Sequence, residues 1–119
     1  GSSEDEIARA SQVTQLVSHI NANTYEEAVL LLGDTNLHPD DPVDIPLIES
    51  LMSSTGLLDS CANVNCSELY HIDRLLFRSS DTLALEIEQW TNENTFYDSN
   101  GSPLSDHPAL SIQVKWDSQ

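Results

Sequence analysis

Positive charge is scarce in this chain. Its 119 residues include 4 lysines and arginines against 20 aspartates and glutamates, which gives a formal net charge of −16. Lysine and arginine side chains supply most of the affinity of proteins for nucleic acid, because they neutralise its phosphates. The composition therefore counts against extended contact with DNA or RNA. It does not exclude a nuclease, because a bound metal ion can still hold a single phosphate locally.

Long apolar runs and cysteines are also scarce. No apolar run reaches the roughly 18 residues that a membrane-spanning helix requires. The two cysteines, Cys61 and Cys66, are not followed by a second Cys/His pair at the spacing of zinc ligands, which argues against a zinc site. They either close a small disulfide loop, which would indicate an oxidising compartment, or remain as two thiols, one of them buried.

Two segments have apolar residues at helical spacing. The first begins at residues 3–6, where a hydroxyl and acidic side chains suit a helix N-terminus, and ends within residues 21–24. The second covers residues 45–55, with Gly56 as its C-cap, and its inward face would consist of Leu47, Ile48, Leu51 and Met52. The proline-broken acidic segment between them, residues 38–44, is predicted to be a charged surface loop.

Four further segments have the patterns of β-strands. The continuous apolar run at residues 28–32 predicts a strand that is buried on both faces. Residues 71–79 predict a second strand, whose core side chains would be Ile72, Leu75 and Phe77. Apolar and polar residues alternate at 83–91 and 109–116, which predicts two more strands joined by a polar loop. Helices and strands together predict one domain of the α+β class.

Three short acidic motifs follow, lie within or precede these strands. They are Gly-Asp-Thr-Asn at residues 33–36, Ile-Asp-Arg at 72–74 and Ser-Asp-His at 105–107. Each alone is compatible with an ordinary turn or with a structural ion pair, for example between Asp73 and Arg74 or Arg78. Delivered together to one end of a sheet, they supply three carboxylates, an amide and an imidazole. That set suits a divalent metal ion and a general acid–base acting on a phosphate ester.

The chain resembles the C-terminal half of the endonuclease/exonuclease/phosphatase superfamily, which includes DNase I-like nucleases, sphingomyelinases and inositol-polyphosphate phosphatases. The resemblance runs from about Tyr25 to Trp116 and is densest at residues 29–36, 71–79 and 104–108. It implies half of a four-layered α/β/β/α sandwich, with a mainly antiparallel sheet and helices on one face. Residues 90–116 look most like secreted microbial members, which favours a secreted or otherwise extracytoplasmic protein and a Cys61–Cys66 disulfide.

Complete members of this superfamily are much longer, and their first half supplies a metal-binding glutamate. We therefore interpret residues 4–116 as the C-terminal half of a DNase I-like hydrolase domain and 117–119 as a tail. Residues 1–3, Gly-Ser-Ser, are interpreted as an expression scar. This chain alone is expected to be an incomplete enzyme. Its expected partners are the missing N-terminal half or a second copy of itself, besides a phosphodiester substrate.

The resemblance also implies roles for five side chains. His107 would contact the phosphate and exchange a proton, while Asp73 would accept a hydrogen bond from its other ring nitrogen. Asp34 would align or deprotonate the attacking water, and Asn36 would hold Asp34 and a phosphoryl oxygen. Asp106 would bind the metal ion, directly or through water. The expected ion is Mg²⁺, or another divalent cation such as Mn²⁺ or Ca²⁺.

The predicted function is metal-dependent hydrolysis of a phosphodiester. A phospholipid headgroup of the sphingomyelin type is favoured over nucleic acid, because the chain is so acidic. The alternatives are a nuclease of the same superfamily and a non-catalytic half-domain that assembles with a partner polypeptide. His71, two residues before Asp73, is predicted to be a bystander.

Overall fold

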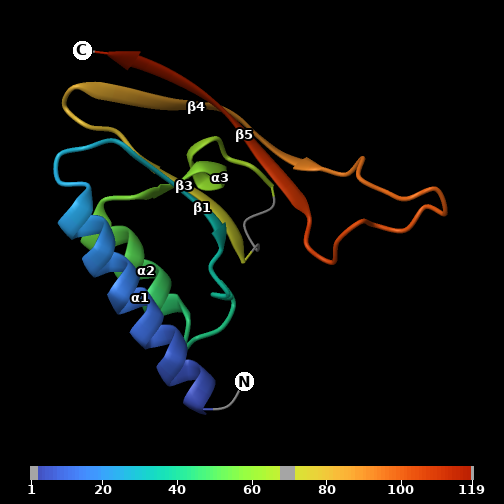
Figure 1. Cartoon of the computed structure of the whole chain (residues 1–119), viewed down its shortest axis with the longest axis horizontal. Helices are drawn as coiled ribbons and strands as arrows, with labels where there is room; N and C mark the ends of the chain where they lie inside the picture. Colours follow the sequence, from blue (N-terminus) through green and yellow to red (C-terminus); the bar gives the residue numbers. More distant parts are fainter. Residues whose placement is uncertain (1–2, 68–71, 119) are drawn as a thin grey trace.

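The computed structural model describes residues 3–67 and 72–118, so His71 lies outside the described residues. The element order is α1 (Ser3–Asn23), β1 (Val29–Asp34), α2 (Ile45–Thr55), β2 (Leu58–Asp59), α3 (Ser60–Asn63), β3 (Asp73–Arg78), β4 (Leu83–Glu93) and β5 (Ala109–Ser118) (Figure 1). Helices and antiparallel strands confirm the predicted α+β class. Within the described ranges, no helix combines the length and apolar character needed to cross a bilayer.

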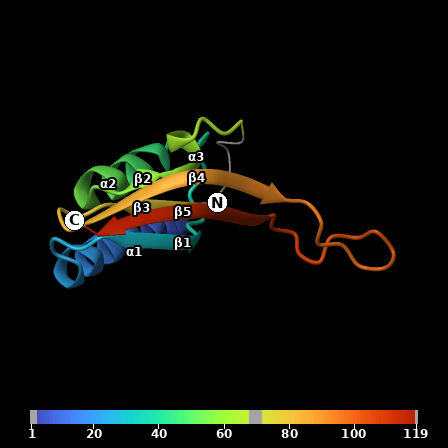
Figure 2. The ribbon, with the colours of Figure 1, turned by 90° about the horizontal axis from the view of Figure 1, so that it is seen from above.

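The strands form two antiparallel sheets. In the first, β3 lies between β1 and β2, and β1 pairs with β3 from Val29 opposite Arg78 to Asp34 opposite Asp73. The second is the long hairpin of β4 and β5, whose register shifts at a bulge between Ile87 and Gln89. Helices α1 and α2 lie on one side of the first sheet, and the hairpin crosses its other side (Figures 1 and 2). Strands β1 and β3, which carry Asp34 and Asp73, are thus held between the helices and the hairpin.

The main core lies between the helices and the first sheet. Its central residue is Leu76, which is fully buried on β3 and was not among the predicted core residues of this strand. Phe77 is buried as predicted, whereas Ile72 and Leu75 are only partly buried. Side chains alternate across a strand, so Leu76 faces the helices and Phe77 faces the hairpin side. The buried members of this core are Val13, Ile20, Leu37, Leu51, Leu57 and Leu76.

The prediction that the first strand is buried on both faces is wrong. Val29 and Leu31 pack against the core, but the side chains of Leu30 and Leu32 are 48% and 56% exposed. Leu30 lies directly opposite Phe77 in the sheet, and Phe77 is buried. The second side of the sheet is therefore covered over the central strand β3 and left open over the edge strand β1.

The predicted surface loop at residues 38–44 contains a buried acid, which corrects that prediction. Asp44 is fully buried, and its Oδ1 accepts a hydrogen bond of 3.0 Å from Nε of Arg9 on α1. Its Oδ2 accepts the backbone N–H of His38 at 3.0 Å. Burial by itself raises the pKa of Asp44, but the bonds from His38 and Arg9 outweigh it, and the pKa is lowered. Asp44 thus joins α1 to the start of α2.

The predicted disulfide is confirmed. Cys61 and Cys66 are bonded, with their Cα atoms 5.1 Å apart. Cys61 lies in the short helix α3, which the sequence patterns did not predict. The carboxylate of Asp59 caps this helix by accepting the backbone N–H groups of Cys61 and Ala62.

Candidate acid–base and metal site

Two aspartates face each other where β1 and β3 meet at one end of the sheet. Asp34 is the last residue of β1, Asp73 is the first of β3, and the two are direct cross-strand partners. Like charges directly opposite each other in an antiparallel pair are destabilising. Their charge repulsion is relieved by a cation, so this end of the sheet is suited to hold one.

The imidazole of His107 lies beside both carboxylates. Its Nδ1 is 2.7 Å from Oδ2 of Asp73, and its Nε2 is 3.9 Å from Oδ2 of Asp34. His107 stands shortly before β5, so the third motif reaches the first two although 34 residues separate it from Asp73. The structure therefore brings Asp34, Asp73 and His107 together at one exposed end of the sheet.

The alternative structural partners of Asp73 are engaged elsewhere. The guanidinium of Arg74 donates to the hydroxyl of Thr35 and to the backbone carbonyl of Leu37. Within the part of the chain that the structure describes, the guanidinium of Arg78 donates to oxygens of Thr24, Glu27 and Thr55. Of the partners predicted for Asp73, the two arginines and an imidazole, it is the imidazole of His107 that contacts its carboxylate.

The pKa of His107 is raised above its ordinary value. The hydrogen bond from the imidazole to Asp73 is the largest cause, and the charge of this carboxylate adds to it. Desolvation has a small opposing effect, while the charges of Asp34 and Asp106 raise the pKa further. The protonated imidazolium is therefore favoured in the folded protein, as expected for a group that faces three carboxylates.

We predict that Asp73→Asn lowers the pKa of His107, because it removes the hydrogen-bonded charge. NMR titration of the His107 ring protons measures this directly, with Asp81→Asn, at an exposed aspartate before β4, as the control. The folded pKa lies above the unfolded value of about 6.5. The stabilisation from His107 is therefore complete below that pH and lost as the pH rises through the folded pKa. If His107 titrated identically in Asp73→Asn and in the wild type, the pairing of His107 with Asp73 would be contradicted.

The other two predicted site residues lie close to this group but play less direct parts in it. Asn36 has a left-handed backbone, with φ of 52°, and its backbone N–H donates to Oδ1 of Asp34 at 2.8 Å. The residue thus holds Asp34 through its backbone, whereas the prediction concerned its side chain. Asp106 is exposed beside His107, where its charge acts on the imidazole.

Sequence reasoning missed the contribution of Thr35. Its backbone N–H and its hydroxyl both donate to the carbonyl of Ile72, at 2.9 and 2.7 Å. These bonds extend the pairing of β1 and β3 one step beyond Asp34 and Asp73, and so keep the two carboxylates side by side. The residue lies inside the Gly-Asp-Thr-Asn motif, but a threonine in a turn carries no sequence signal for this role.

Three groups that can bind a divalent cation lie close together, the carboxylates of Asp34 and Asp73 and, in its neutral form, the imidazole of His107. One ligand atom from each residue lies within 4.8 Å of the other two. Carboxylate oxygens suit Mg²⁺, Mn²⁺ and Ca²⁺, and imidazole suits transition metals. Asp106, the predicted ligand, is not part of this compact group. The donor set can therefore take part in a metal site, with oxygen ligands from Asp34 and Asp73.

A hollow of about 390 Å³ adjoins His107. It is formed by the ends of β4 and β5 and by the loop between them, which projects from the body of the protein (Figure 2). Phe96, Tyr97 and Leu104 supply its apolar surface, and Glu93 and Asp106 supply negative charge. None of the described residues that line it is a lysine or an arginine. The surroundings of His107 therefore suit an apolar or cationic group.

No protein-family model matches this chain, and a comparison with curated proteins found no match. The superfamily resemblance therefore rests on the three motifs themselves.

Proposed function

We propose that this chain is the C-terminal half of a metal-dependent phosphodiester hydrolase of the endonuclease/exonuclease/phosphatase type. The observation that supports this most is the contact of His107 with Asp73, at 2.7 Å, in front of Asp34. The chain would form one half of the α/β/β/α sandwich, and an upstream half would supply the remaining metal ligands. The disulfide is compatible with a secreted or otherwise extracytoplasmic protein.

In this proposal, His107 and Asp73 act as an acid–base pair. Asp73 holds Nδ1 and so leaves Nε2 directed towards Asp34 and the space in front of it. The raised pKa of His107 favours the imidazolium, which can bind a phosphoryl oxygen and donate a proton to the leaving group. Asp34, held by the N–H of Asn36, would align or deprotonate the attacking water.

Charge balance explains why such a site needs a metal ion. Asp34, Asp73 and Asp106 surround His107, and three carboxylates would repel a phosphate. A bound Mg²⁺, or Mn²⁺ or Ca²⁺, would neutralise the phosphoryl oxygens and stabilise charge in the transition state. Asp34 and Asp73 would contribute oxygen ligands from this chain, with Asp106 bound through water.

The proposed substrate is a phospholipid headgroup of the sphingomyelin type. A choline group is a cation, and the hollow beside His107 offers the aromatic rings of Phe96 and Tyr97 together with carboxylates. Aromatic faces attract quaternary ammonium groups. A polynucleotide would instead bring many negative charges to a chain with a net charge of −16. A nuclease of the same superfamily is the alternative.

Metal removal tests this proposal. In the complete protein, chelation with EDTA should abolish hydrolysis of a phosphocholine diester, and added Mg²⁺ should restore it. Unchanged turnover in EDTA would contradict the metal site. Hydrolysis of DNA but not of the phosphocholine diester would leave the metal mechanism standing and favour the nuclease.

One observation favours a second candidate, a half-domain that assembles with another polypeptide. Leu30 and Leu32 on β1 and Leu58 on β2 are exposed apolar side chains on the hairpin side of the first sheet. A partner that covered them would bury this surface. Light scattering distinguishes the candidates, because a monomer at all concentrations that hydrolyses substrate would exclude obligatory assembly.

A further inference from the structure

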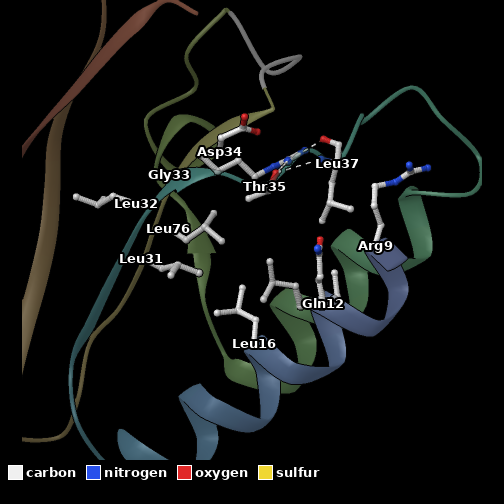
Figure 3. Close-up of a pocket in the computed structure, with 13 residues that line it drawn as sticks. Arg9, Gln12, Leu16, Leu31, Leu32, Gly33, Asp34, Thr35, Leu37 and Leu76 are labelled. Carbon is white, nitrogen blue, oxygen red and sulfur yellow. Dashed lines mark hydrogen bonds between the residues drawn. The ribbon is translucent and has the colours of Figure 1, made fainter. Parts of the chain in front are cut away.

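A second cavity lies on the other side of β1, between this strand and helix α1. Its volume is about 200 Å³, and Figure 3 shows Leu16 and Gln12 of α1 directed into it. Leucines from both helices, from β1 and β3 and from the loop after β1 form nearly half of its lining, namely Leu16, Leu31, Leu32, Leu37, Leu51 and Leu76. A partly open hollow that combines apolar walls with a few charged and polar side chains is typical of a small-molecule site.

Two of the polar groups in this wall are arginines, and they differ in how their charge is balanced. Arg9 is paired with the buried carboxylate of Asp44. Arg74 is only 7% exposed, and its Nη1 donates to two neutral oxygens, the hydroxyl of Thr35 and the carbonyl of Leu37. Among residues 3–67 and 72–118, Arg74 forms no ion pair, and its Nε and Nη2 have no hydrogen-bond partner.

A largely buried guanidinium without a paired anion is unfavourable, since burial removes part of its hydration. Burial indeed lowers the pKa of Arg74, and the charges of Asp59 and Asp44 counter this only in part. Both carboxylates are already engaged, Asp44 with Arg9 and Asp59 with the start of α3. Nε and Nη2 of Arg74 are not among the buried atoms that lack a partner, so they remain open to solvent and available to an anion that enters the cavity.

We propose that this cavity binds a short aliphatic monocarboxylate, with its chain among the leucines and its carboxylate at Arg74. Guanidinium and carboxylate form strong, charge-assisted hydrogen bonds. An apolar cavity of about 150 Å³ holds a benzene molecule, so the 200 Å³ here suits about eight non-hydrogen atoms, as in hexanoate. Asp34 also borders the cavity, but its carboxylate points away from the leucines (Figure 3).

Binding of hexanoate to this chain tests the proposal, with hexan-1-ol and hexylamine as comparison ligands of equal chain length. Hexanoate should shift the methyl NMR signals of Leu31 and Leu76 saturably, and should raise the melting temperature by about 5 °C at ten times its dissociation constant. Hexan-1-ol should bind at least about tenfold more weakly. Hexylamine should not bind in the cavity, although the net charge of −16 attracts cations.

Two variants of α1 provide a matched pair. Gln12→Trp should fill the cavity and weaken hexanoate binding by at least about tenfold, whereas Gln15→Trp, at an α1 residue that does not line the cavity, should leave it unchanged. Arg74→Met, if it folds, should abolish the preference for hexanoate over hexan-1-ol. Absent or non-saturable binding, equal binding of the three ligands, or unaltered binding by Gln12→Trp would overturn the proposal.

Discussion

Replacing His107 by alanine in the complete protein should lower kcat by about 10²–10⁴-fold, the usual contribution of a general acid–base. The imidazole is the only group in the cluster with Asp34 and Asp73 that exchanges protons readily near neutral pH. The variant also leaves the two opposed aspartates without their cation. Steady-state kinetics on a phosphocholine diester measures the loss.

The matched control is His19→Ala. His19 is an exposed histidine on α1, where its ring faces Asn23. This substitution should leave kcat unchanged. Because the side chain of His107 is 41% exposed, its removal should preserve the circular dichroism spectrum, so that a kinetic loss is not mistaken for unfolding. A loss in kcat of less than about tenfold would refute the role of His107.

Replacing Asp44 by alanine should lower the free energy of unfolding by about 3–5 kcal/mol, the typical cost of breaking a buried ion pair. The substitution leaves the guanidinium of Arg9 and the N–H of His38 without their acceptor. It also releases α1 from the start of α2. Chemical denaturation monitored by circular dichroism measures the change.

The pH dependence of the same variant provides a second measurement. The pKa of Asp44 is lower in the folded protein than its ordinary unfolded value of about 3.9. The stabilisation is therefore complete above that pH and disappears as the pH falls through the folded pKa. The difference between wild type and Asp44→Ala should shrink in acid. Asp40→Ala, at an exposed aspartate of the same loop, should cost little, and an equal loss would contradict the buried pair.

Local patterns predicted most of the elements correctly. Apolar spacing placed α1 and α2, and alternation placed β4 and β5, because these patterns depend on near neighbours along the chain. The predicted strand at residues 28–32 corresponds to β1, which extends to Asp34. Short elements such as β2 and α3 were missed, because so few residues carry no periodicity.

The chemistry of the motifs predicted the residues of the candidate site. The pairing of strands in the structure is what brings them into contact. The sequence predicted that Asp34, Asp73 and His107 could reach one end of a sheet, and that Asp73 needed a partner. The structure supplies the pairing of β1 with β3 that sets the two aspartates opposite each other. It also shows that the partner of Asp73 is the imidazole, whereas Arg74 turns to Thr35 and Leu37.

By itself, the sequence determined the α+β class, the acidity that disfavours nucleic acid and the identity of the ionisable groups at the site. Only the tertiary structure decided that Leu30 is exposed, that Asp44 is buried against Arg9 and that Arg74 borders a cavity. The physical reason is that burial and pairing depend on segments far apart in the chain, 35 residues apart for Arg9 and Asp44. A residue type and its immediate neighbours do not contain that information.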